Sequence, residues 1–209
     1  MCGRFVLLTD LSVVSEAFDI QHSASEYKQG NNISPGQQIT AAVRRDNRNI
    51  LVNFRWGLIP SWAKDPSIGN KMFNARAETV AEKPSFRNAF YKRRCLIIAD
   101  GFYEWQRQEK IKTPYCFRLK SGQPFGFAGL YESWISPENQ QINTCTIITT
   151  RANELIKPIH DRMPVILEKE EERLWIDPNT HNRDILLSVL KPYVSQDLDV
   201  SEAGALLKD

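Results

Sequence analysis

The feature that most constrains the fold is a series of short apolar segments in the second half of this 209-residue chain. They are of strand length, and short turns such as Lys120–Gln123 separate several of them. Aromatic and β-branched residues bounded by turn residues are typical of β-strands. We therefore expect strands at Cys95–Ala99, Phe102–Gln106, Tyr115–Leu119, Phe125–Tyr131 and Thr144–Thr149.

The rest of the chain adds further strands and several helices to this sheet. Residues 21–36 and 56–66 are polar or rich in Pro and Gly, which predicts irregular loops. The further strands are expected at Gly3–Leu8, Ile39–Arg44, Ile50–Arg55 and Val165–Leu167. Helices are expected at residues 10–19, 74–82, 84–92, 152–157, 169–176 and 183–190. This order predicts an α+β fold with a curved, largely antiparallel, barrel-like sheet and peripheral helices.

Length and composition limit the number of domains, the partners and the cofactors. The length suits one domain over residues 1–209, with a core at about 2–190 and a C-terminal tail at about 191–209. A net charge of +2 neither requires nor excludes nucleic acid as a partner. None of the four cysteines has the C-x-x-C spacing of a zinc site, so we expect no metal and no cofactor. Without a signal peptide or an apolar span, the expected location is the cytoplasm, or the nucleoid when DNA is bound.

Cys2 is a candidate nucleophile because of its position. Removal of Met1 would leave an α-amine and a thiol on adjacent carbons. In model peptides their pKa values are about 8 and about 8.5, so both are partly nucleophilic near neutral pH. Such a 1,2-aminothiol condenses with aldehydes to form a thiazolidine. The alternative is a chance cysteine at a frayed terminus.

Seven sequence blocks favour the first of these interpretations. They are Met1–Phe5, Asn32–Gly36, Trp56–Pro60, Asn74–Thr79, Ala99–Trp105, Thr149–Asn153 and Ile159–Pro164. The blocks and their order resemble the SOS-response-associated peptidase family, the bacterial and eukaryotic abasic-site processing proteins. The resemblance covers about residues 1–190.

The resemblance implies four catalytic residues. Cys2 would form the thiazolidine with the ring-opened sugar of an abasic site, and Asn74 would hydrogen-bond near it. Glu104 and His160 would transfer protons, and a carboxyl group among aromatic side chains can acquire a raised pKa that suits this role. Each also has a simpler explanation: a helix N-cap for Asn74, an outward-facing strand carboxylate for Glu104 and a structural histidine for His160.

The resemblance also implies contacts with DNA. Arg4 and Arg76 would bind phosphates near the lesion, as would Arg162, which could instead fix its own loop by pairing with Asp161. Pro35 and Trp62 would wedge between bases or stack on them. Some relatives carry two adjacent tryptophans where this chain has Ser61-Trp62-Ala63, which predicts a weaker wedge. Trp56 and Trp105 are expected in the core.

The expected function is capture of abasic sites in single-stranded DNA, as part of the response to DNA damage. The crosslink would protect the lesion, with removal of Met1 by the protein itself and weak lyase action as companion activities. The first alternative is a cysteine peptidase with an N-terminal nucleophile. The second is a single-strand-binding module without chemistry. A monomer with no membrane partner is expected in each case.

Overall fold

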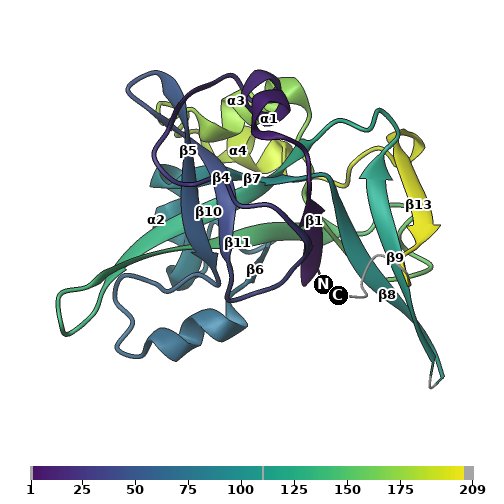
Figure 1. Cartoon of the computed structure of the whole chain (residues 1–209). Coiled ribbons are helices and arrows are strands. Elements are labelled where there is room, and N and C mark those ends of the chain that lie inside the picture. Colours follow the sequence, from purple (N-terminus) through teal and green to yellow (C-terminus); the bar gives the residue numbers. More distant parts are fainter. Residues whose placement is uncertain (1, 110, 205–209) are drawn as a thin grey trace.

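The structure is a computed structural model that describes residues 2–109 and 111–204. Its centre is a ring of five strands: β4 (Gln38–Arg45), β5 (Arg48–Trp56), β7 (Arg94–Ala99), β10 (Phe125–Ile135) and β11 (Gln141–Arg151). Neighbouring strands pair antiparallel in the order β11-β10-β7-β4-β5. Parallel pairing of β5 with β11, Arg55 opposite Thr144 and Trp56 opposite Cys145, closes the barrel. The predicted α+β fold with a barrel-like sheet is confirmed (Figure 1).

Local sequence explains the best-predicted parts of this barrel. Every residue of β7 is buried, as expected for an apolar run in the middle of a sheet. Asp46 and Asn47 both have positive φ, 47° and 58°, in the turn between β4 and β5. Two such residues match the right-handed twist of the strands that they join, so the turn sets the register of this hairpin.

A second sheet packs beside the barrel and carries the N-terminus. Its order is β13 (Leu198–Glu202), β9 (Ile111–Leu119), β8 (Gly101–Gln108), β1 (Arg4–Leu7) and β3 (Gly30–Ile33). The first strand of the chain thus lies between β8 and β3 and is hydrogen-bonded on both sides. The β8–β9 hairpin extends away from the barrel (Figure 1). Neither β13 nor β3 was expected from the sequence.

Three short strands extend the barrel sheet. They are β2 (Ile20–Ser23), parallel to β5, β6 (Asn74–Arg76), parallel to β11, and β12 (Arg162–Pro164), antiparallel to β11. The helix expected at residues 74–82 is therefore wrong, because β11 offers backbone partners that hold β6 extended, and turns follow it. The loop expected at 21–36 contains β2 and β3, and the strand expected at 165–167 is displaced to β12.

The helices are peripheral. They are α1 (Leu11–Ala17), α2 (Pro84–Lys92), α3 (Lys169–Ile176), α4 (Arg183–Ser188) and the 3₁₀ turns η1 (Pro66–Lys71) and η2 (Ser195–Asp197). Pro84 is the first residue of α2, as predicted, and Glu168 and Glu171 form a capping box at the start of α3. The helix expected at residues 152–157 is absent, and turns span residues 154–159 instead. Within the described ranges no helix has the length and apolar character needed to cross a membrane.

Candidate active site

Cys2 lies two residues before Arg4, the first residue of β1 in the second sheet. Its side chain is fully buried, and its Sγ is 3.9 Å from the carbonyl oxygen of Arg4. Arg4 is opposite Tyr103 in the antiparallel pair of β1 and β8. Because partners in an antiparallel pair run in opposite directions, the residues before Arg4 lie beside Glu104, the residue after Tyr103.

Asn74 connects this terminus to the barrel. It starts β6, which is paired with β11 through Ile147. Its Nδ2 donates a hydrogen bond of 2.8 Å to the carbonyl oxygen of Cys2. Its Oδ1 is buried and has no hydrogen-bond partner within the described part of the chain. No helix follows Asn74, so the helix N-cap explanation is wrong.

Glu104 lies on β8 with only 3% of its surface exposed, so the explanation as an outward-facing carboxylate is also wrong. Burial raises the pKa of its carboxyl group, and the positive charge that His160 can carry lowers it. The pKa of the Cys2 thiol is raised mainly by burial and further by the negative charge of Glu104. Glu104 therefore lies close enough to both Cys2 and His160 for electrostatic interaction.

His160 is in the loop before β12. The backbone N–H of Arg162 donates a hydrogen bond of 2.9 Å to its Nδ1. The Oδ1 of Asp161 is also 2.9 Å from Nδ1. A hydrogen bond between these two atoms would require a proton on Nδ1. The two contacts exclude each other, and we favour the first because the side chain of Asp161 is 86% exposed and its attraction is screened by water. In the neutral ring the proton is then on Nε2.

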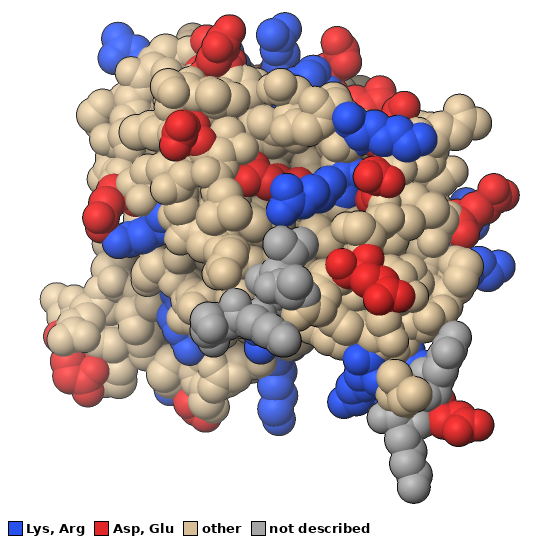
Figure 2. Space-filling view, turned by 45° about the vertical axis from the view of Figure 1, so that its right-hand side comes forward, with Lys and Arg blue, Asp and Glu red and all other residues tan. Residues whose placement is uncertain are grey.

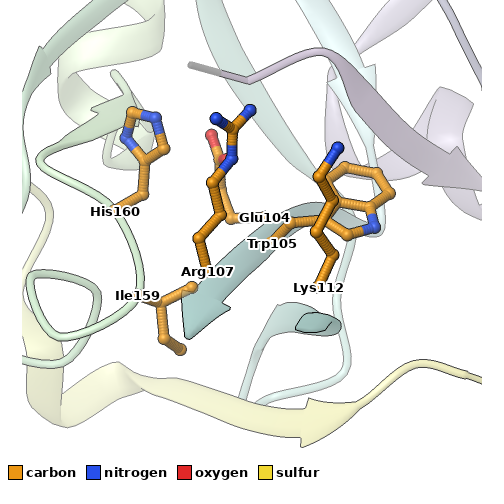
Figure 3. A pocket seen from close by; sticks show the side chains of 6 residues that line it. All are labelled: Glu104, Trp105, Arg107, Lys112, Ile159 and His160. Atoms are coloured by element: carbon orange, nitrogen blue, oxygen red, sulfur yellow. The ribbon is translucent and has the colours of Figure 1, made fainter. Parts of the chain in front are cut away.

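A pocket of about 530 Å³ opens beside Glu104 and His160. Figure 3 shows its walls, which β8, β9 and the His160 loop supply. Four of the lining residues were not expected at the site: Trp105, Arg107, Lys112 and Ile159. Trp105 is half-buried at the pocket instead of in the core, whereas Trp56 is buried as expected. Recognition of the β8–β9 hairpin would have placed Arg107 opposite Lys112.

Two of the arginines expected to contact DNA are held by polar partners. The Nη1 of Arg4 donates to Oδ1 of Asn32 over 2.6 Å. The guanidinium of Arg162 forms two parallel hydrogen bonds with Glu78, 2.6 and 3.0 Å long, and a third with the carbonyl oxygen of Thr149. Arg162 therefore joins β12 to β11 and to the turn after β6.

The other expected DNA contacts have exposed or half-exposed side chains. Arg76 is exposed on β6, and Pro35 is half-buried in the loop after β3. Trp62 exposes 59% of its surface and lines a shallow hollow of about 320 Å³ with Lys64 and Lys71. Trp62 is not among the residues that line the pocket beside Glu104.

One face of the molecule carries charges of both signs. Figure 2 shows basic and acidic side chains interspersed over the face that it presents, without one continuous basic surface. Among the described residues, no group of three or more His, Cys, Asp or Glu side chains could hold a metal ion. All four cysteines are free thiols and buried.

The fold and these residues define a class of protein: a small α+β barrel with a cysteine at the second position beside a buried glutamate. Residues 1–207 match the model of a family described as SOS response associated peptidase (SRAP), and the chain belongs to that family.

Relatives from bacteria and eukaryotes support this assignment. The chain is 48% identical to the abasic site processing protein YoqW of Bacillus subtilis over 99% of this chain and 94% of that one. It is 35% identical to the abasic site processing protein HMCES of Xenopus tropicalis over 63% of this chain and 46% of that one. A crystal structure of a protein from Bacteroides thetaiotaomicron superposes with a TM-score of 0.88 at 28% identity, covering 96% and 91% of the two chains.

Proposed function

We propose that this protein processes abasic sites by a covalent crosslink from Cys2 to the lesion in single-stranded DNA. The crosslink shields the aldehyde during the response to DNA damage. Relatives named abasic site processing proteins support the substrate. The observation that carries the chemistry is the convergence on Cys2 of two side chains distant in sequence: Asn74 through a hydrogen bond and Glu104 through its charge.

The crosslink requires a free α-amine on Cys2. Met1, which lies outside the described residues, must first be removed. The amine then adds to the C1′ aldehyde of the ring-opened sugar, and loss of one water gives an imine. The thiol adds across the C=N bond, with its sulfur on C1′ and its proton on nitrogen. The thiazolidine product has the mass of protein plus DNA minus one water.

The site residues supply protons and orientation for these steps. Because burial and Glu104 raise the pKa of the thiol, the thiol stays protonated while the amine attacks first. Glu104 has a raised pKa itself, so it can take a proton from the amine and return it to the departing hydroxyl. The Oδ1 of Asn74 can accept a hydrogen bond from the amine or from a sugar hydroxyl. In this proposal His160 donates a hydrogen bond to the sugar through Nε2–H.

The imine also permits weak lyase action. Loss of a C2′ proton to a base such as Glu104 can expel the 3′ phosphate by β-elimination. Closure to the thiazolidine removes the imine and so competes with this cleavage. In this proposal Arg4 and Arg76 contribute positive charge toward the DNA strand, Arg162 holds its loop through Glu78, and Pro35 and Trp62 contact bases.

A second activity, peptide hydrolysis by an N-terminal nucleophile, is favoured by the description of the family as a peptidase. The most economical substrate is the protein's own Met1–Cys2 bond, whose hydrolysis consumes one water and frees the amine that the crosslink needs.

Intact mass spectrometry tests the proposal, before and after incubation with single-stranded DNA that carries one abasic site. We expect loss of Met1 and then an adduct of protein plus DNA minus water. Cys2→Ala should give no adduct, and Cys116→Ala, a control at another buried thiol, should give the full yield. Absence of an adduct from wild-type protein that has lost Met1 would overturn the crosslinking function.

A further inference from the structure

Two basic residues of the pocket have no role in the chemistry above. Arg107 on β8 is directly opposite Lys112 on β9. Directly opposed like charges on two paired strands destabilise the pair. Within the described residues neither side chain forms an ion pair, although Arg93, Arg162 and Lys169 each have a carboxylate partner. The hairpin thus keeps two uncompensated positive charges side by side.

Both charges lie at the pocket that contains Glu104. Arg107 and Lys112 line it together with Glu104 and His160, and both are exposed to solvent. Figure 3 shows the two side chains extending from the hairpin to the same side as the carboxyl group of Glu104, with Trp105 beside Lys112. An anion that enters the pocket therefore meets two cations as well as the carboxyl group of Glu104.

We propose that Arg107 and Lys112 form the binding site for the phosphate on the 3′ side of the abasic sugar. This inference rests on the proposed function. In the ring-opened sugar the 3′ phosphate oxygen is attached two carbons from the aldehyde, and the 5′ phosphate oxygen is attached four carbons away. When the aldehyde is at Cys2 beside Glu104, the 3′ phosphate is the nearer anion and reaches the adjoining wall of the same pocket.

The two cations have complementary chemistry for this task. The planar guanidinium of Arg107 can donate two parallel hydrogen bonds to phosphate oxygens, and the ammonium of Lys112 adds a compact charge. Binding of the anion also relieves the repulsion between them. Arg107 and Lys112 would therefore set the position of the DNA on the 3′ side of the lesion, while Cys2 and Glu104 act on the aldehyde.

The test measures non-covalent binding, so that it is independent of the crosslink. The ligand is single-stranded DNA with one tetrahydrofuran residue, which has no aldehyde, as the abasic analogue. The double variant Arg107→Gln/Lys112→Gln is compared with Arg45→Gln/Arg48→Gln, a control pair that is also opposed across a hairpin but does not line the pocket. Both variants lose the same net charge.

We expect the pocket variant to bind several-fold more weakly, with the slope of log K against log salt reduced by about 0.7 for each cation removed. The control should differ little from the wild type. A neutral methylphosphonate on the 3′ side of the analogue should abolish the difference between the pocket variant and the wild type, whereas one on the 5′ side should leave it.

Three results would overturn the inference: equal affinities of the pocket variant and the wild type, an equal loss in the control, or loss of the difference only with the 5′ methylphosphonate. Failure of the proposed function is seen separately, as absence of an adduct between the wild-type protein and natural abasic DNA. Circular dichroism and the Tm of each variant show that the fold is retained.

Discussion

The side-chain amide of Asn74 donates a 2.8 Å hydrogen bond to the carbonyl oxygen of Cys2, across 72 positions of sequence. Asn74 belongs to β6, which is paired with a strand of the barrel, whereas Cys2 precedes a strand of the second sheet. This bond thus links Cys2, which precedes a strand of one sheet, to the frame of the other. Its geometry leaves Oδ1 of the same amide available at the site.

Asn74→Ala should destabilise the protein and slow crosslinking. Removal of the donor leaves the carbonyl of Cys2 without this partner, which costs about 1–3 kcal/mol for a buried group. Urea denaturation measures the loss, and gel analysis of adduct formation gives the rate. The control is Asn143→Ala at an exposed position of β11. Unchanged stability and rate in Asn74→Ala would show that the bond has no importance.

Glu104 should make the protein less stable as pH rises, whereas an ordinary ion-paired carboxylate makes a protein more stable as pH rises. Its pKa is raised in the folded state, so the folded protein holds this proton more tightly than the unfolded chain. Stability from this group is present at low pH and is lost as pH rises through the folded pKa. Glu104→Gln should therefore raise the free energy of unfolding at pH 7 and have little effect below about pH 4, while it slows crosslinking.

Glu78 provides the matched opposite case. The hydrogen bonds from Arg162 lower the pKa of its carboxyl group, so its stabilising contribution is present at neutral pH and is lost on acidification. Glu78→Gln should lower the free energy of unfolding at pH 7. Denaturant titrations at several pH values compare the two variants, and an effect of the same sign in both would refute the environments assigned to them.

Arg162 should affect the rate of crosslinking mainly by holding its loop in place, and less by binding the DNA strand. Lysine at this position keeps the charge but cannot form the two parallel hydrogen bonds that Arg162 makes with Glu78. Arg162→Lys should therefore slow crosslinking without changing the salt dependence of DNA binding. Arg76→Gln, at an exposed arginine, should reduce the salt slope by about 0.7. Arg162→Gln removes the charge. If this variant reduced the slope of log K against log salt for DNA binding, Arg162 would instead contact a DNA phosphate.

Trp62→Ala should weaken binding of single-stranded DNA and leave stability nearly unchanged. Its side chain is 59% exposed, and a base stacked on it contributes roughly 1–3 kcal/mol of binding. Ile135→Ala is a control because Ile135, the last residue of β10, is also a large apolar residue with 61% of its surface exposed. Fluorescence anisotropy measures binding, and equal affinities of the two variants would remove Trp62 from the interface.

Strong local signals made much of the fold predictable. Short apolar runs bounded by turn residues identified the barrel strands, and Pro84 marked the start of α2. Such signals act over a few residues and need no distant partner. The motif blocks likewise indicated Cys2 and Glu104 before any geometry was known.

The segments that were predicted wrongly depend on distant partners. Asn74–Arg76 has no strand pattern of its own and is extended only because β11 offers an unpaired edge. The strand Leu198–Glu202 exists because β9 has a free edge on the β8–β9 hairpin. Backbone hydrogen bonds at such edges outweigh weak local preferences, and the sequence does not show which edge is free.

The sequence by itself determined the class of fold and the chemical groups of the site, because strand periodicity and residue identity are local properties. Only the tertiary structure decided that Asn74 orients Cys2, that Glu104 is buried and that Arg107 and Lys112 share its pocket. These relationships arise from the pairing of strands far apart in the chain. Burial and charge proximity, which set the pKa values, exist only once those strands have packed together.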